Sequence, residues 1–137
     1  MSESSGSIPV HEGLFADGEQ PTLLGSRCGE CGAHHFPVHE QCPYCSSGDV
    51  ARCDLSPRGV LWAWTSVTAA PPGYRGDVPF GFGVVELPEG LRVLTRLTEA
   101  DPSRLEAGAA MALVVVPLHV DEEGRSVTTF AFAPASP

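Results

Sequence analysis

Residues 28–45 have the sequence Cys-Gly-Glu-Cys-Gly-Ala-His-His-Phe-Pro-Val-His-Glu-Gln-Cys-Pro-Tyr-Cys, in which two Cys-x-x-Cys pairs stand ten residues apart. Each pair places two sulfurs on one side of a tight turn. Two such turns facing each other offer four thiolates to a metal that accepts four ligands in a tetrahedron, which is the pattern of a zinc ribbon. We therefore expect one structural zinc ion per chain, bound by Cys28, Cys31, Cys42 and Cys45.

The residues within the two pairs suit such a centre. Gly29 and Gly32 permit the positive φ that a backbone turning beneath a metal usually needs, and Pro43 stiffens the second turn. An all-cysteine shell is closed, whereas a hydrolytic zinc keeps a position open for water and usually includes histidine or carboxylate ligands. The metal is therefore expected to stabilise this segment, with no catalytic role.

Disulfide bonds and a redox-active dithiol are the alternatives for these cysteines. A secreted disulfide scaffold would begin with a signal peptide, but residues 1–7, Met-Ser-Glu-Ser-Ser-Gly-Ser, have neither a positive region nor an apolar stretch. A redox site would need one Cys-x-x-Cys pair and a surrounding βαβ pattern. A cytoplasmic chain with metal-bound thiolates is the better interpretation.

The other cysteine and the histidines nearby are less suitable as metal ligands. Cys53 is a fifth cysteine, and with four ligands available we expect it to be a small buried residue. His34, His35 and His39 lie between the two pairs and could displace a thiolate, although histidines in such positions are more often simply exposed.

The composition favours strands and turns. Of 137 residues, 42% are hydrophobic and 18% charged, and 13 prolines with 15 glycines leave little room for long helices. No apolar run approaches the roughly 20 residues that a membrane-spanning helix needs. The formal net charge is −9 and lysine is absent, so 8 arginines are set against 17 carboxylates. That balance argues against nucleic acid as a partner, since its phosphates must be neutralised on binding.

Three parts follow from the local patterns: a tail of residues 1–21, the zinc ribbon of residues 22–53 and a β domain of residues 54–137. The tail is expected to be frayed over residues 1–10, with one short helical turn carrying Leu14 and Phe15. A short strand over residues 22–27 leads into the first cysteine pair.

Within the β domain, strand-like segments alternate with turn residues. Asp101, Pro102 and Gly108 are typical of one short helix between the third and fourth of these segments. The five segments are residues 59–68, 80–87, 91–97, 110–120 and 126–133. This order predicts an OB-fold, a small five-stranded Greek-key barrel, although periodicity alone leaves a sandwich or an SH3-like barrel possible.

The first barrel strand is apolar on both faces. Val60, Trp62 and Trp64 are expected to point one way, and the alternating residues Leu61, Ala63, Thr65 and Val67 the other. One face can line a core, so the other must be covered by the ribbon, by a loop or by a second protein.

Taken in order, several segments resemble a known family. They are Leu24-Gly25-Ser26-Arg27 before the first pair, Phe36-Pro37 before Cys42-Pro43-Tyr44-Cys45, Gly59, Pro71-Pro72-Gly73-Tyr74, Val85-Glu86-Leu87 with Gly90, and Asp101-Pro102 with Gly108. Over residues 22–120 the chain resembles the acyl-CoA-associated OB-fold proteins with an N-terminal rubredoxin-like zinc ribbon, catalogued as domain of unknown function thirty-five. The N-terminal helices common in that family are shortened here by glycines and Pro21.

The resemblance implies a non-catalytic subunit of a hetero-oligomer. Members of that family accompany thiolase-like or ketosynthase-like enzymes, including sterol-carrier-protein-type thiolases that act as retro-aldolases in steroid side-chain degradation, and sometimes enoyl-CoA hydratases. The implied role is to dock on the catalytic subunit, order its active-site region and help enclose the acyl-CoA thioester.

A proline-rich loop, residues 69–79, joins the first two barrel strands, where OB-folds habitually bind their ligands. Its stiff apolar surface loses little entropy when a partner orders it. Arg75 could meet a partner carboxylate or a coenzyme A phosphate. The candidates for contact with a protein partner or an acyl-CoA are Pro71, Pro72, Tyr74, Arg75, Phe80, Trp62 and Trp64.

The residues themselves show no catalytic constellation. The sequence contains no Gly-x-Ser-x-Gly, no phosphate-binding glycine loop and no His-Glu-x-x-His. His119, Asp77, Glu86 and Glu89 are typical strand-end or turn residues. The alternatives to an accessory subunit are a single-stranded nucleic-acid binder that stacks bases on the barrel aromatics, which the acidity opposes, and a free-standing acyl-CoA carrier.

Overall fold

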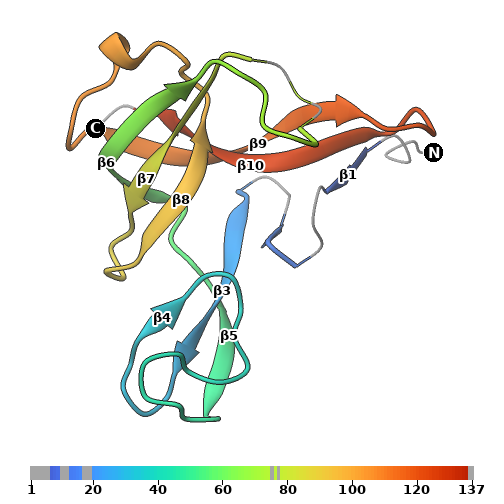
Figure 1. The fold of residues 1–137 in the computed structure, drawn as a ribbon. Helices are drawn as coiled ribbons and strands as arrows, with labels where there is room; N and C mark the ends of the chain where they lie inside the picture. The colour runs from blue at the N-terminus through green and yellow to red at the C-terminus, as the bar shows by residue number, and fades with distance from the viewer. Residues whose placement is uncertain (1–6, 10–12, 17–19, 75, 77, 136–137) are drawn as a thin grey trace.

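The computed structural model describes residues 7–9, 13–16, 20–74, 76 and 78–135. Strands dominate this part of the chain and build two sheets (Figure 1). The elements are β1 (Ser7–Pro9), β2 (Phe15–Ala16), β3 (Thr22–Cys28), β4 (His34–His35), β5 (Val50–Asp54), β6 (Arg58–Val67), β7 (Phe80–Glu86), β8 (Arg92–Leu97), a 3-10 turn (Pro102–Arg104), β9 (Ala110–Val120) and β10 (Ser126–Pro134). Within the described ranges, no helix has the length and hydrophobicity to traverse a membrane.

Five strands close into a barrel in the order β6-β7-β8-β10-β9, with β9 returning to pair with β6. Closure depends on β10, which runs antiparallel to β9 and meets β8 in parallel where Phe132 lies beside Leu97. On the other side, Gly59 of β6 pairs with Met111 of β9. The prediction of a mainly β protein with a five-stranded barrel is confirmed.

The second sheet is organised by β3. This strand pairs antiparallel with β2, β4 and β5, in a register that sets Ser26 opposite His35 and Gly25 opposite Cys53. In Figure 1, β3, β4 and β5 form a lobe below the barrel, and the link from β5 to β6 joins the two. The cysteine pairs therefore belong to a small unit attached to one end of a larger one.

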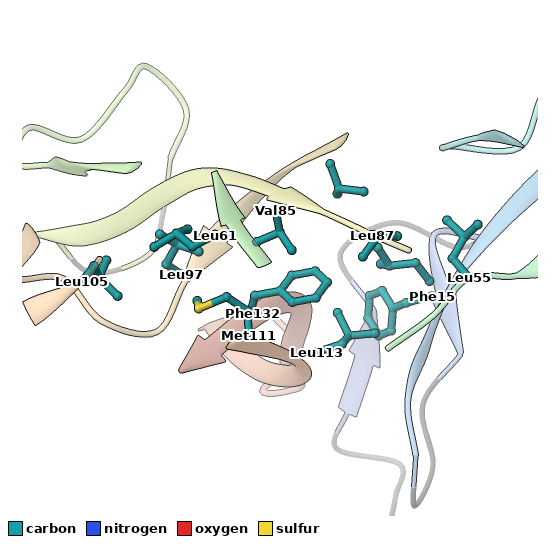
Figure 2. Packing of buried hydrophobic residues seen from close by; sticks show 12 residues of the cluster. Phe15, Leu55, Leu61, Val85, Leu87, Leu97, Leu105, Met111, Leu113 and Phe132 are labelled. Carbon is teal, nitrogen blue, oxygen red and sulfur yellow. The ribbon is translucent and has the colours of Figure 1, made fainter. Parts of the chain in front are cut away.

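The barrel core follows from the alternation of side chains along each strand. In β8, for example, Val93 and Leu97 are buried while Leu94 is exposed. Figure 2 shows Met111 and Phe132 near the middle of the buried cluster, and both are 0% exposed. Fully burying one such side chain stabilises the fold by about 1.5 to 3 kcal/mol. Inward positions of every barrel strand are thus filled from within the chain.

The core continues into the base of the ribbon. Phe15 and Leu55 belong to the same buried cluster as Leu87 of the barrel (Figure 2). Phe130 of β10 has edge-to-face contacts with Phe15 and with Phe36 of the ribbon, at centroid distances of 6.3 and 5.6 Å. Such pairs contribute about 0.5 to 1.5 kcal/mol beyond area burial. The ribbon is therefore held on the barrel by apolar packing as well as by the chain.

The N-terminal segment forms strands where a frayed tail and a helical turn were expected. Residues Phe15–Ala16 pair with β3, and the N–H of Leu24 donates to the carbonyl of Leu14 at 2.8 Å. Ser7–Pro9 lies parallel to β10. The helical turn around Leu14 and Phe15 is a wrong prediction, because the open edge of β3 recruits these residues and periodicity does not record such tertiary pairing. The neighbouring residues 10–12 and 17–19 lie outside the described ranges.

Between β8 and β9 the expected short helix is a single 3-10 turn. The Asp101 side chain caps it by accepting the N–H of Ser103 at 3.0 Å, and Gly108 adopts a φ of 84°. The cap was predicted correctly, but the turn ends at Arg104 because Leu105 turns to extended backbone with its side chain buried, so Gly108 does not terminate a helix.

A β-bulge in β6 corrects the expected direction of one tryptophan. Leu61 pairs with Val85 and Ala63 with Val84, so one extra residue, Trp62, is accommodated between them. Beyond the bulge Trp64 packs against the buried core, and its indole N–H donates to the carbonyl of Pro102 at 3.0 Å. Trp62 remains 52% exposed. The prediction that Trp62 and Trp64 share a face is therefore wrong.

This arrangement predicts different costs for the two tryptophans. Trp64→Ala should lower the free energy of unfolding by about 2 to 3 kcal/mol, because it empties a core position and removes a hydrogen bond. Trp62→Ala should cost less than about 1 kcal/mol, since it removes an exposed ring. Urea denaturation of both variants measures the difference, and equal losses would contradict the bulged register.

Candidate functional site

Each cysteine pair sits in the same backbone turn. The N–H of the fourth residue after the first cysteine donates to that cysteine's carbonyl, from Gly32 to Cys28 at 3.0 Å and from Ser46 to Cys42 at 2.9 Å. Both donors have a positive φ, 79° for Gly32 and 67° for Ser46. The two turns are thus equivalent in geometry although only one has glycine at the left-handed position.

The four sulfurs converge on one point between these turns. The Sγ atoms of Cys28 and Cys45 are 3.5 Å apart, those of Cys31 and Cys42 are 3.7 Å apart, and all four lie within 4.8 Å of one another. Zinc–sulfur bonds of about 2.3 Å in a tetrahedron require sulfur separations of about 3.8 Å. The donor set and its spacing therefore fit a tetrahedral zinc ion.

The charges at this cluster also suit a cation. The backbone N–H groups of Cys31 and Glu30, each 3.4 Å from Cys28 Sγ, lower the pKa of Cys28 to about 6 against the effect of burial. The N–H of Ser47 lowers the pKa of Cys45. The neighbouring Cys28 sulfur and burial have a larger combined effect in the opposite direction, and the pKa rises to about 12. Four thiolates so close together can ionise jointly only when a cation compensates their charge.

Two residues near the four cysteines, Gly29 and His35, differ from what the sequence predicted. Gly29 does not have the positive φ expected of it. A Cβ there would meet the carboxylate of Asp49, an exposed side chain that can move aside. His35, expected to be exposed, is buried and hydrogen-bonded through Nδ1 to Ser26 Oγ at 2.8 Å, and burial lowers the pKa of His35. Among the described residues, the group with metal-ligand geometry contains only the four cysteines.

Cys53 lies outside this group. It is half-buried in β5, and burial raises the pKa of its thiol. It therefore offers a matched cysteine away from the cluster.

A second feature is an apolar surface on the barrel. Four large side chains from three adjacent strands point outward: Val60 and Trp62 of β6, Phe82 of β7 and Leu94 of β8, exposed by 42, 52, 37 and 67%. Leu94 is paired with Val84, and Val84 with Ala63, so the strands bring these side chains onto one face. We call this set the outer apolar face. It was anticipated only as one apolar side of the first strand.

Charged side chains border the outer apolar face. The guanidinium of Arg92 lies 4.1 Å from the centroid of the Trp62 ring and pairs with Glu86 at 3.4 Å. At the other end, Arg96 lies opposite Phe82 in the strand register. The face is therefore apolar in the middle with cations at its rim.

The structure brings together some of the residues in or beside the proline-rich loop that were predicted to contact a partner or an acyl-CoA. Tyr74 and Phe80 pack with ring centroids 5.1 Å apart, next to Arg96, whereas Pro71 and Pro72 are exposed. Arg75 lies outside the described residues. Sequence reasoning missed Arg96; its place beside Leu94 on the outward side of a largely apolar strand was the signal that could have identified it.

The carboxylates considered for catalysis have ordinary roles. Glu86 pairs with Arg92, and a side-chain oxygen of Glu89 accepts the backbone N–H of Ser56 at 2.8 Å. Asp77 lies outside the described residues. His119, in β9, pairs with Val127 across the β9–β10 ladder.

Comparison with known proteins agrees with the zinc ribbon and with the barrel. Residues 15–51 match the family model described as ChsH2, rubredoxin-like zinc ribbon domain, and residues 53–116 match that of the ChsH2 C-terminal OB-fold domain. A DUF35 domain-containing scaffold protein of Pyrococcus furiosus is 31% identical over 117 residues, covering 85% of each chain. The chain belongs to the DUF35 family.

Two further relatives of this DUF35 chain have informative names. The benzoylsuccinyl-CoA thiolase subunit BbsA of Thauera aromatica is 31% identical over 117 residues, which cover 85% of this chain and 79% of that protein. Among solved structures, a chain of the Ltp2-ChsH2(DUF35) aldolase superposes with a TM-score of 0.65 at 27% identity, covering 84% of this chain and 86% of that one. The predicted family, zinc ribbon and OB-fold are thereby confirmed.

The equivalent turns yield a paired prediction. Ser46→Gly should raise the free energy of unfolding by about 0.5 to 1 kcal/mol, because it relieves a left-handed backbone at a residue with a Cβ, whereas Gly32→Ala should lower it by about 1 to 2 kcal/mol. Denaturation of both variants in zinc-containing buffer, with metal content measured in parallel, checks this. A stabilised Gly32→Ala or a destabilised Ser46→Gly would contradict the shared geometry.

Proposed function

We propose that this chain is a non-catalytic accessory subunit that docks on a thiolase-like catalytic subunit acting on acyl-CoA. The observation that carries the proposal is the outer apolar face. Neither the ribbon nor the part of the proline-rich loop that the structure describes covers it. Contiguous apolar patches with a polar rim are typical of protein interfaces.

The composition of this face is that of an interaction surface. Tryptophan and arginine are enriched at interfaces, and Trp62, with Arg92 stacked on it at the rim of the face, provides both. Leu94, the most exposed member, has its cross-strand neighbour Val84 beside it. A partner surface that is apolar in the centre and carries carboxylates at its edge would complement these residues.

The names of the relatives indicate the kind of partner. BbsA is called a thiolase subunit, and the similar solved structure is an aldolase in which ChsH2(DUF35) accompanies Ltp2. By this analogy the partner is an enzyme that makes or breaks a carbon–carbon bond in an acyl-CoA, with a steroid side-chain retro-aldolase as one form. Ordering the active site of that enzyme and helping to enclose the acyl-CoA are further parts of the proposal. The partner could instead be an enoyl-CoA hydratase, and the test must distinguish a hydratase from a thiolase-like enzyme.

The nucleic-acid alternative has less support. Of the aromatic residues proposed to stack bases, Trp64 is turned inward by the bulge and Trp62 already carries Arg92. With a net charge of −9 the chain would also repel a phosphate backbone.

The zinc ion is proposed to have a structural role, with Cys28, Cys31, Cys42 and Cys45 as its four ligands. Their shell is closed, and the segment between them contributes little to the apolar core. When bound, the metal would supply cross-linking of the two turns, which a segment of this size needs to stay folded.

Metal analysis tests this assignment. Purified chain expressed with zinc should contain one zinc ion, and Cys28→Ser or Cys42→Ser should lose both the metal and the fold of the ribbon. Cys53→Ser is the matched control and should keep one zinc. Wild-type protein without zinc, or equal loss of zinc in the control, would refute the ligand set.

Docking is tested by co-expression with any thiolase-family protein encoded beside this chain. Leu94→Glu or Trp62→Glu should weaken association by at least about 2 kcal/mol, or about thirtyfold, because a carboxylate would be buried in the interface. Val120→Glu is the control, since Val120 is also 62% exposed but lies at the far end of β9. No association of wild-type protein with any thiolase-family enzyme would refute the function. Association with a hydratase instead would change the partner, and micromolar oligonucleotide binding with a steep salt dependence would favour the nucleic-acid alternative.

A further inference from the structure

Arg96 is a half-buried cation held by aromatic rings. Its guanidinium carbon lies 4.5 Å from the centroid of Phe80 and 5.8 Å from that of Tyr74, and Nη1 donates to the Tyr74 hydroxyl at 2.7 Å. Arg96 alternates with the buried Thr95 and Leu97, so β8 directs it to the outside of the barrel. The side chain is thus fixed in place on the surface of the barrel wall.

No carboxylate within the described ranges pairs with this guanidinium, although the chain has 17 acidic residues. The other half-buried arginine that the structure describes, Arg125, pairs with Asp121 at 2.9 Å. Cation–π contacts and one neutral hydrogen bond leave most of the five N–H donors of Arg96 available. In a protein so rich in acids, a positioned and partly desolvated guanidinium of this kind indicates an anion from outside the chain.

Two adjoining hollows meet at Arg96 and Phe80. One, of about 240 Å³, extends between β8 and the β9–β10 arm past Leu94, Thr129 and Phe130. The other, of about 220 Å³, extends past Thr98, Val116 and Pro117. The first hollow is largely apolar, whereas the second has polar and apolar lining in similar amounts. Thr129 in the first hollow and Thr98 in the second offer hydroxyl groups that can donate to an oxyanion.

We propose that Tyr74, Phe80 and Arg96 form a binding site for a phosphate ester of a small molecule that also carries an apolar arm. The planar guanidinium would bind two phosphate oxygens, and the apolar hollow beside it would accept the arm. A single cation in an acidic chain fits one phosphorylated small molecule better than a polyanionic strand. The coenzyme of the proposed function and free nucleotides both have this chemistry, and the site does not depend on docking.

Direct binding to the isolated full-length chain tests the site. Calorimetric titration at low ionic strength would use three probes: coenzyme A, ADP and phosphate-free pantetheine. We expect saturable binding of coenzyme A, with or without binding of ADP, and no binding of pantetheine. Binding of both phosphorylated probes would identify a general phosphate site, and binding of coenzyme A alone would show that the pantetheine arm contributes.

Variants assign the binding to this residue. Arg96→Gln should weaken it by about ten- to a hundredfold, the value of one charge-assisted contact, and Arg96→Lys should restore it only in part because the planar fork is lost. Arg52→Gln, an equal change of charge on the exposed β5 of the ribbon, should bind as wild type. Thermal melts confirm that each variant is folded. Three results would overturn the site: no binding of either phosphorylated probe, equal binding of pantetheine, or unchanged binding in Arg96→Gln. None of them would affect the docking proposal.

Discussion

The β-barrel is filled by its own inward side chains, and this constraint determines what the rest of the molecule can do. Once β10 has closed the barrel around Phe132 and Met111, the outward side chains of β6, β7 and β8 have no place inside the chain. In most small domains such positions are polar. In this barrel the outward positions include Trp62 and Leu94, so folding leaves an apolar surface exposed. Such a surface is typical of a site where another molecule binds.

The ribbon solves a different problem, that of a segment too small to build a core. Its sheet depends on β3, its turns on the four-sulfur cluster, and its attachment on the contact of Phe36 with Phe130. The four-cysteine shell is closed, which suits the structural role proposed for the metal, and the proposed recognition surface lies on the barrel. A stable ribbon packed beside the barrel can also hold the long β9–β10 arm, whose Phe130 lines the hollow next to Arg96.

Sequence patterns predicted whatever depends on local spacing. The two Cys-x-x-Cys pairs, the alternation of the barrel strands and the cap formed by Asp101 all appear where expected. The bulge at Trp62 could not be foreseen, because a strand apolar on both faces gives no signal of a change in register. The pairing of Ser7–Pro9 with β10 and the grouping of Arg96 with Tyr74 depend on strand edges and on a loop path that only the tertiary structure defines.

Side-chain footprinting of the complex tests the central claim most directly. Hydroxyl-radical labelling of the chain, free and bound to the proposed thiolase-like subunit, reports the solvent access of individual residues. The account predicts that Trp62 and Leu94 become strongly protected on binding, while Val120, equally exposed in the free chain, is labelled as before. Unchanged labelling of Trp62 and Leu94 in a stable complex would show that the partner docks elsewhere and would contradict the account.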